Sequence, residues 1–195
     1  MKVLFVSPNT ERLTMPVLPL GRALVAAATR RAGHQTRFFD LLGAPDPVAA
    51  VCQAITELQP DVIAISTRNV DDQSMQETKF LLAPAQNVMA TCRAANYAKL
   101  VVGGAGYNIF PDAALAYLDA DYGVCGEGEV VFPALLERFQ RGQNVIRLPG
   151  LYSRGCQPLT ARIFAKNLDL LPLPEADLCP SIQIAICQRK QASLL

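Results

Sequence analysis

The stretch Lys99-Leu-Val-Val-Gly-Gly-Ala-Gly106 decides the fold. Its three consecutive aliphatic residues, with no polar residue between them, indicate a strand that is buried on both of its faces. The glycines that follow predict a turn at the carboxyl end of this strand, because glycine adopts backbone conformations that other residues avoid. A buried strand of this kind is typical of a parallel sheet covered by helices on both sides.

A short apolar strand followed by a helix recurs along most of the chain. Apolar runs predict the strands, and apolar positions at helical spacing predict the helices. We expect strands at 3–6, 36–39, 61–65, 99–102 and 121–125, and helices at 21–31, 48–58, 80–95, 111–118 and 129–141. This alternation predicts an α/β fold with a doubly wound five-stranded parallel sheet, in the flavodoxin-like strand order 2-1-3-4-5.

We expect two parts in the chain, an α/β domain at 1–143 and a C-terminal extension at 144–195. The extension is expected to form a hairpin and then an extended linker, because prolines interrupt regular structure in its later part. The segments concerned are the hairpin strands at 151–153 and 160–164, the turn Arg154-Gly155, and the stretch Leu170-Leu-Pro-Leu-Pro174 with Pro180.

Composition excludes several classes of protein. With 195 residues, 51% of them hydrophobic, the chain can bury a core without a disulfide or a metal ion. Its net charge of +1 argues against a nucleic-acid partner, which requires a basic face. No run of about 18 apolar residues occurs, so we expect no membrane-spanning helix. The apolar stretch near the N-terminus is too short for a signal peptide, and we therefore expect a cytoplasmic protein.

The six cysteines are scattered along the chain and include no CxxC pair. They are Cys52, Cys92, Cys125, Cys156, Cys179 and Cys187. We expect them to be reduced, as is usual in the cytoplasm, and to pack as small hydrophobic side chains.

The loops at the carboxyl ends of the predicted strands are the candidate ligand site, since open α/β sheets bind ligands at that edge. The candidate contacts are Ser7, Pro8, Asn9 and Thr10, then Ser66, Thr67, Arg68 and Asn69, then Gly103, Gly104, Ala105 and Gly106, and finally Gly126, Glu127 and Gly128. Glycines without a Cβ would let a large, flat, amide-rimmed ligand lie against the main chain, and hydroxyl and amide side chains would bind its edge. The alternative is that these glycines only form tight turns.

Local tests exclude several familiar ligands. The first strand is followed by Ser7-Pro-Asn-Thr10 and not by the GxGxxG of dinucleotide-binding proteins. The chain contains no GxxxxGKS/T phosphate-binding loop, and the loop after the first strand lacks the small residues of a flavodoxin. It also lacks the carboxylates with which a receiver domain holds a divalent cation.

Four stretches together resemble the N-terminal cobalamin-binding domain of class B radical S-adenosylmethionine enzymes. They are Ile65-Ser-Thr-Arg-Asn-Val-Asp71, Val102-Gly-Gly-Ala-Gly-Tyr-Asn-Ile-Phe-Pro111, Val124-Cys-Gly-Glu-Gly-Glu129 and Pro149-Gly-Leu-Tyr152. The stretch Asn167-Leu-Asp-Leu-Leu-Pro-Leu-Pro174 is similar to the family's linker into its catalytic barrel. The resemblance covers nearly the whole chain, and it implies a Rossmann-like cobalamin-binding fold.

The resemblance implies that cobalamin binds in its base-off form, with the corrin over the strand ends and the nucleotide tail near Gly103 and Gly104. The DxHxxG motif that supplies a cobalt ligand in other cobalamin domains is absent, and His34 is the only histidine. We expect His34 to be an exposed turn residue at the opposite edge of the sheet, so no protein residue is assigned as a metal ligand.

Arg68 follows the third predicted strand, where the lower face of the corrin would lie. We hypothesise that it occupies the space below cobalt without coordinating it, because a guanidinium carries no free lone pair. The alternative is a solvated loop arginine, or one paired with Asp71 or Asp72.

Two pairs of residues near the same loops have competing interpretations. Glu127 and Glu129 suit the N-terminal end of a helix better than a general acid/base pair. Tyr107 and Phe110 are expected either to stack on a ligand or to pack in the core.

The sequence lacks the CxxxCxxC motif that holds the iron–sulfur cluster of radical S-adenosylmethionine enzymes. We therefore assign no catalytic residue, and we expect S-adenosylmethionine and the cluster only in a full-length parent enzyme of the methyltransferase type. Its catalytic domain would act in cis or in trans. The alternatives are a stand-alone cobalamin carrier or sensor that docks on a partner protein, and a nucleotide- or flavin-binding domain.

Overall fold

The computed structural model describes residues 1–9, 19–42, 44–72, 74–95, 98–156, 162 and 164–174. The strands are β1 (Lys2–Ser7), β2 (Gln35–Asp40), β3 (Val62–Ser66), β4 (Lys99–Gly103), β5 (Tyr122–Val124) and β6 (Leu151–Ser153). The helices are α1 (Leu20–Arg31), α2 (Pro47–Leu58), α3 (Leu82–Ala95), α4 (Pro111–Tyr117) and α5 (Gly128–Gln140), followed by the 3₁₀ turn η1 (Leu168–Leu170). The five predicted strands and five predicted helices are confirmed, with ends that differ by a few residues.

The sheet has the order β2-β1-β3-β4-β5-β6, so the predicted order of the first five strands is confirmed. The predicted number of five strands is wrong, because β6 joins the sheet antiparallel to β5, with Val124 opposite Leu151 and Tyr122 opposite Ser153. Pairing with β5 covers a sheet edge that would otherwise expose unpaired backbone groups. The other expected hairpin strand, 160–164, lies largely outside the described residues.

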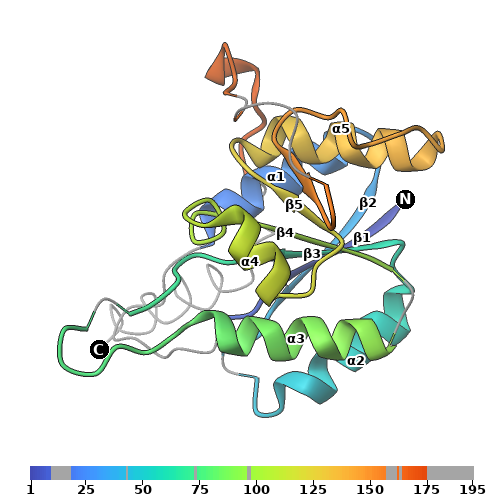
Figure 1. The fold of residues 1–195 in the computed structure, drawn as a ribbon. Coiled ribbons are helices and arrows are strands. Elements are labelled where there is room, and N and C mark those ends of the chain that lie inside the picture. Colours follow the sequence, from blue (N-terminus) through green and yellow to red (C-terminus); the bar gives the residue numbers. More distant parts are fainter. Residues whose placement is uncertain are drawn as a thin grey trace, which may run out of the picture.

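Helices cover both faces of the sheet, as Figure 1 shows, with α1 and α5 on one face and α2 and α3 on the other. Alternate side chains of β1 point to opposite faces of the sheet. Val3 and Phe5 pack toward α1 and α5, whereas Leu4 and Val6 pack toward α2 and α3. Each such side chain contributes about 1.5–3 kcal/mol through burial, which explains why the strands read as unbroken apolar runs.

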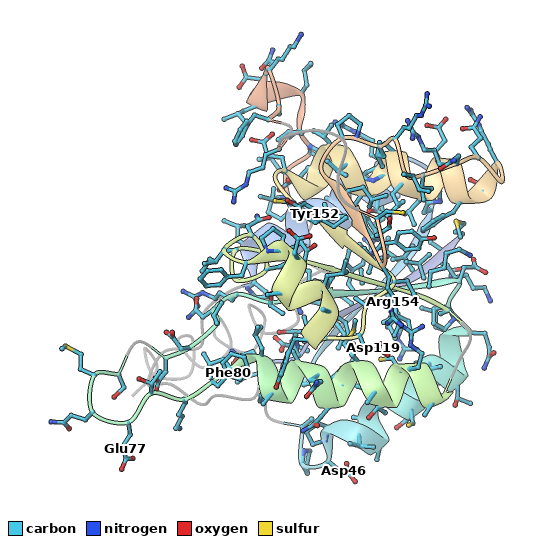
Figure 2. The ribbon with its side chains drawn as sticks, in the orientation of Figure 1. Asp46, Glu77, Phe80, Asp119, Tyr152 and Arg154 are labelled. Atoms are coloured by element: carbon cyan, nitrogen blue, oxygen red, sulfur yellow. The ribbon has the colours of Figure 1, made fainter. Side chains whose placement is uncertain are left out.

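The parallel arrangement places the carboxyl ends of β1, β3, β4 and β5 at one edge of the sheet. At this carboxyl edge, Ser66 of β3 lies directly opposite Gly103 of β4. The local sequence sets the helices between the strands: Asp46, labelled in Figure 2, accepts hydrogen bonds from the amides of Val48 (3.1 Å) and Ala49 (3.0 Å) and so begins α2.

Two findings bear on the expected class of protein. Among the described residues, none of the helices combines the length and the apolar character needed to cross a membrane. Cys52, Cys92, Cys125 and Cys156 are free thiols. Cys179 and Cys187 lie outside the described residues.

Candidate functional site

Main-chain hydrogen bonds join the loop after β3 to the loop after β4. The amide of Thr67 donates to the carbonyl of Gly103 (2.9 Å), and the amide of Gly106 donates to the carbonyl of Thr67 (3.1 Å). Thr67 is buried, with 3% of its surface exposed. The structure therefore brings two of the predicted loops together into one continuous rim.

The glycines after β4 are required by the neighbouring loop of the chain itself. Gly104 has a φ of +101°, and a Cβ on it would lie 2.4 Å from the carbonyl oxygen of Thr67 and 2.8 Å from Oγ of Ser66. A Cβ on Gly106 would lie 3.0–3.1 Å from backbone atoms of Arg68 and Asn69. Protein packing alone therefore requires glycine at these two positions, and the expectation that they also let a ligand lie against the main chain stays a prediction.

Asn108 joins the loop after β4 to the loop after β5. Its Oδ1 accepts a hydrogen bond from the amide of Gly126 (3.1 Å), and its own amide donates to the carbonyl of Gly104 (3.1 Å). Gly126 has a φ of +99°, so this turn adopts a left-handed conformation that glycine favours. The sequence prediction did not include Asn108 among the site residues. The available signal was an asparagine just after a glycine-rich turn, where its side chain often accepts from a backbone amide.

The loop after β1 contributes a buried start and an exposed polar residue. Ser7 and Pro8 are buried, and the carbonyl of Ser7 accepts a hydrogen bond from the amide of Leu41 (3.1 Å). Asn9 is exposed, and Thr10 lies outside the described residues. Ser7 and Asn9 therefore lie at the same sheet edge as the joined loops.

The exposed part of the rim consists of Arg68, Asn69 and Ala105. Arg68 forms no ion pair or hydrogen bond with another residue that the structure describes. The expected alternative of an Arg68–Asp72 pair is absent there, because Oδ1 of Asp72 accepts from the amides of Lys79 (3.0 Å) and Ser74 (3.1 Å). These hydrogen bonds lower the pKa of Asp72. The guanidinium of Arg68 is therefore exposed at the rim, with no partner among the described residues.

Beyond Asn69 the chain leaves the sheet as an arm and returns to α3. Leu81 donates to the carbonyl of Val70 (2.8 Å), and the ring of Phe80 packs edge-on against Tyr117 of α4, with 5.3 Å between the ring centres. Figure 2 shows Glu77 at the outer end of the arm and Phe80 close to the body of the protein. The arm is thereby anchored beside the rim.

Tyr107 and Phe110 have different surroundings. Tyr107 is fully buried and packs edge-on against Tyr152 of β6, with 6.3 Å between the ring centres. Burial raises the pKa of its hydroxyl well above the usual value. Core packing is therefore confirmed for Tyr107, whereas Phe110 is 61% exposed and Ile109 is 57% exposed. These two apolar side chains lie on the surface next to the rim.

Glu127 occupies the position that begins α5, but its side chain does not cap the helix. Its Oε2 instead accepts a hydrogen bond from the amide of Ala165. The expectation of a capping role is thus wrong for Glu127. Burial, reinforced by the charge of Glu127, raises the pKa of Glu129. Gly128 is needed for helix packing, since a Cβ there would lie 2.8 Å from Cγ2 of Val25 in α1.

His34 lies at the amino edge of the sheet, as expected, but it is buried and not exposed. Only 7% of its surface is accessible, and its Nδ1 lies 3.3 Å from the N-terminal nitrogen of Met1. Gly33, with a φ of +85°, turns the chain so that the histidine ring folds under the start of β1. Burial lowers the pKa of His34, and the positive charge of Met1 lowers it further.

The rim offers hydrogen-bonding groups of the kind expected for a large, amide-rimmed ligand. Within the described ranges, no group of three His, Cys, Asp or Glu residues is placed to hold a metal ion. Serine hydroxyls, the Asn69 amide and main-chain groups instead offer hydrogen bonds to an amide-rimmed edge, as a corrin has. A cavity of about 130 Å³ lies elsewhere, between Arg37 of β2 and Glu57 of α2, and is too small for such a ligand.

Comparisons with known proteins place these observations in a family. The B12 binding domain family matches residues 7–136. An uncharacterized methyltransferase of Pyrococcus horikoshii is 25% identical over 92% of this chain and 39% of its own length. The hopanoid C-3 methylase of Methylococcus capsulatus is 30% identical over 78% of this chain and 29% of its own length. The chain thus spans well under half the length of these relatives.

A solved structure shows the same fold. The radical S-adenosylmethionine methyltransferase TsrM of Kitasatospora setae, with cobalamin and a four-iron–four-sulfur cluster bound, matches with a TM-score of 0.77. The match has 23% identity and covers 91% of this chain and 32% of that protein. The family match covers most of the α/β sheet and all the loops of the rim, and the chain therefore belongs to the B12-binding domain family.

Proposed function

We propose that this chain binds base-off cobalamin at the carboxyl edge of the sheet and serves a radical S-adenosylmethionine methyltransferase as its cobalamin-binding part. One observation carries the proposal: three loops are tied into a continuous rim that exposes Arg68 and Asn69 and, as far as the structure describes it, holds no cluster of metal ligands. Family membership and the names of the relatives support it.

The proposed contacts fall into two groups. Exposed or half-buried residues contact the ligand, and buried residues shape the loops that carry them. The first group is Asn9, Ser66, Arg68, Asn69, Gly103, Gly104, Ala105, Gly126, Glu127 and Gly128, and the second is Ser7, Pro8, Thr67 and Gly106. Thr10 belongs to the proposed contacts as well, although it lies outside the described residues.

Bound cobalamin supplies a cobalt ion that carries and donates a methyl group. The share of this chain is to orient the corrin and to control access to the lower face of cobalt. Arg68 is proposed to lie below the ring, where its permanent positive charge disfavours a lower ligand. His34 has no part in this, because it lies buried at the opposite edge of the sheet.

The chemistry that generates a radical belongs to another segment or another chain. The 195-residue sequence contains no CxxxCxxC motif, and the chain corresponds to 39% and 29% of the two relatives described above. We propose that a catalytic domain with S-adenosylmethionine and the iron–sulfur cluster covers the rim from outside. We also propose a cytoplasmic location, because the reducing cytoplasm would keep thiols such as the four described cysteines free.

A second candidate is a stand-alone cobalamin carrier or sensor that docks on a separate protein. It is favoured by the large apolar residues exposed next to the rim, Ile109 and Phe110. Both candidates require cobalamin binding. They differ in whether a CxxxCxxC motif follows in the same coding sequence.

The test is a spectroscopic titration of the purified chain with hydroxocobalamin and methylcobalamin, with flavin mononucleotide as the comparison ligand. We expect saturable cobalamin binding with a base-off methylcobalamin spectrum and no flavin binding. Flavin binding without cobalamin binding would refute the proposal and favour a flavodoxin-like function.

A further inference from the structure

The chain returns to the rim after β6, and this return segment consists of Arg162 and residues 164–174. Nη2 of Arg162 donates to the main-chain carbonyl of Asn108 (2.6 Å). The amide of Ala165 donates to the carboxylate of Glu127, and Nη1 of Arg31 donates to the carbonyl of Leu170 (2.6 Å). Three side chain–main chain contacts thus hold a segment that is otherwise largely exposed.

The return segment has local order of its own between these contacts. Oδ1 of Asn167 accepts from the amide of Asp169 (2.9 Å), and the amide of Leu171 donates to the carbonyl of Leu168 (3.0 Å). These bonds form the turn η1. The segment is therefore ordered between its contacts at Ala165 and Leu170.

One of these contacts ends at Asn108, which also bonds to the loop after β5. Its carbonyl receives Arg162, and its side chain holds the amide of Gly126 in the loop after β5 (3.1 Å). The amide of Asn108 donates to the carbonyl of Gly104 in its own loop (3.1 Å). One residue is therefore bonded to the return segment, to the loop after β4 and to the loop after β5.

We propose that Asn108 is a positioning residue of the cobalamin site, which transmits docking of the return segment to the loop at Gly126. The inference rests on the proposed function. Without Arg162, the peptide after Asn108 rotates more freely, and the hydrogen bond that Oδ1 of Asn108 accepts from the amide of Gly126 is weakened. Docking of the segment thus holds the rim in one arrangement and strengthens cobalamin binding. By linkage, cobalamin must strengthen docking by the same factor.

A double-mutant cycle on cobalamin affinity tests this coupling. Arg162→Ala removes the contact of the return segment, and Asn108→Ala removes the link to Gly126 while the main-chain carbonyl remains. We expect Arg162→Ala to weaken cobalamin binding about threefold to tenfold in the chain with Asn108, the effect of one hydrogen bond, and less than about twofold in the Asn108→Ala chain. Asn108→Asp should keep the coupling, because its carboxylate still accepts from Gly126.

Lys166→Ala is the matched control. It removes a positive charge from the same segment, at an exposed side chain. Its cobalamin affinity should equal that of the unchanged protein. Equal weakening by Arg162→Ala in both backgrounds would overturn the proposal, as would tighter binding, which would mean that the segment obstructs the site.

Hydrogen exchange without cobalamin separates this inference from the proposed function. Arg162→Ala should speed exchange of the Gly126 amide in the chain with Asn108 and leave it unchanged in the Asn108→Ala chain, where that amide has already lost its acceptor. If the unchanged protein binds no cobalamin, the proposed function fails, and the exchange result alone decides whether Asn108 transmits docking. Unchanged exchange at Gly126 in the Arg162→Ala chain would refute it.

Discussion

The two edges of the sheet are built by different interactions. At the amino edge, carboxylates accept the first amides of neighbouring strands: Asp61 accepts from Lys2 (2.7 Å), and Asp121 accepts from Leu100 (2.8 Å). At the carboxyl edge, main-chain bonds and the Asn108 side chain join the loops, while the charge of Arg68 stays unpaired among the described residues. The amino edge thus uses its carboxylates to hold strands, whereas Arg68 at the carboxyl edge has no such role among the described residues.

Arginines reinforce the amino edge further. Nη1 of Arg93 in α3 lies 2.9 Å from Oδ1 of Asp121, and Arg154 after β6 pairs with Asp119. Figure 2 shows Asp119 and Arg154 next to each other. The antiparallel direction of β6 brings Arg154 to this edge. The comparison implies that substitutions at the amino edge reduce stability alone, whereas those at the carboxyl edge reduce binding.

The largest effect is expected for Gly104→Ala, which breaks the joined rim. A Cβ at this position would lie 2.4 Å from the carbonyl oxygen of Thr67, in a left-handed backbone conformation with φ of +101°. We expect a loss of about 2–4 kcal/mol in the free energy of unfolding and loss of cobalamin binding. Chemical denaturation and titration measure the two effects.

Gly21→Ala is the control for this change, because a Cβ on Gly21 in α1 would meet no atom within 4 Å. That variant should be stabilised by roughly 0.5–1 kcal/mol, since alanine favours a helix over glycine. Equal stability of the Gly104→Ala chain and the unchanged protein would show that the two loops are not packed as described.

Asp121→Ala should lower the free energy of unfolding by about 1–2 kcal/mol and leave cobalamin affinity unchanged. The substitution removes the acceptor of the Leu100 amide and the partner of Arg93. Asp121→Asn keeps an acceptor oxygen and should lose less. Denaturation curves measure the stability of both variants, and titrations measure their cobalamin affinity. A change in cobalamin affinity without a loss of stability would contradict a purely structural role of the amino edge.

Arg68→Ala should weaken cobalamin binding and leave stability nearly unchanged, which is the opposite of the effect expected for Asp121→Ala. Because Arg68 is exposed and forms no bond to another described residue, its loss should change stability by less than about 0.5 kcal/mol. Cobalamin affinity should fall about fivefold to tenfold, about 1–1.4 kcal/mol, or the cobalt spectrum should change. Arg141→Ala, which removes an exposed arginine at the end of α5, serves as control. If both arginine variants behave like the unchanged protein in affinity and spectrum, Arg68 has no role below cobalt.

The smallest effect concerns His34 and pH. Burial, and then the Met1 ammonium, lower the pKa of the folded protein's His34 below 6.5, while Glu137 raises it. The unfolded chain therefore binds a proton first as the pH falls through about 6.5, and stability decreases until the folded histidine is protonated too. His34→Gln should unfold with a shallower dependence on pH between about 7.5 and 5.5. Identical slopes for both proteins would contradict the buried position of His34.

The local patterns predicted the first five strands, their order and all five long helices, because each depends on apolar spacing within a short window. The strand at 151–153 was expected as part of a hairpin, but its pairing with β5 could not be predicted, since three residues carry no signal for the partner with which they pair. The packing of Gly104 against the neighbouring loop could not be predicted for a related reason. Its neighbour is Thr67, far away in sequence, and a glycine next to protein looks the same as one next to a ligand.

The sequence predicted which loops lie at the carboxyl edge, but not which of their residues contact one another. Strand polarity placed Ser66, Arg68 and Ala105 at one edge, as observed. The hydrogen bonds that Asn108 accepts from Gly126, and that Glu127 accepts from Ala165, depend on the meeting of separate segments. An asparagine just after a glycine-rich turn suggests an acceptor for some backbone amide, but the sequence does not say which amide it meets.

Hydrogen exchange with and without cobalamin tests the central claim most directly, because one experiment reports on both edges of the sheet. We predict that cobalamin slows exchange in the loops around Ser66–Asn69, Gly103–Asn108 and Cys125–Gly128, and leaves the amino edge around Asp61 and Asp121 unchanged. Protection confined to the amino edge, or saturable cobalamin binding without protection of these loops, would contradict the account.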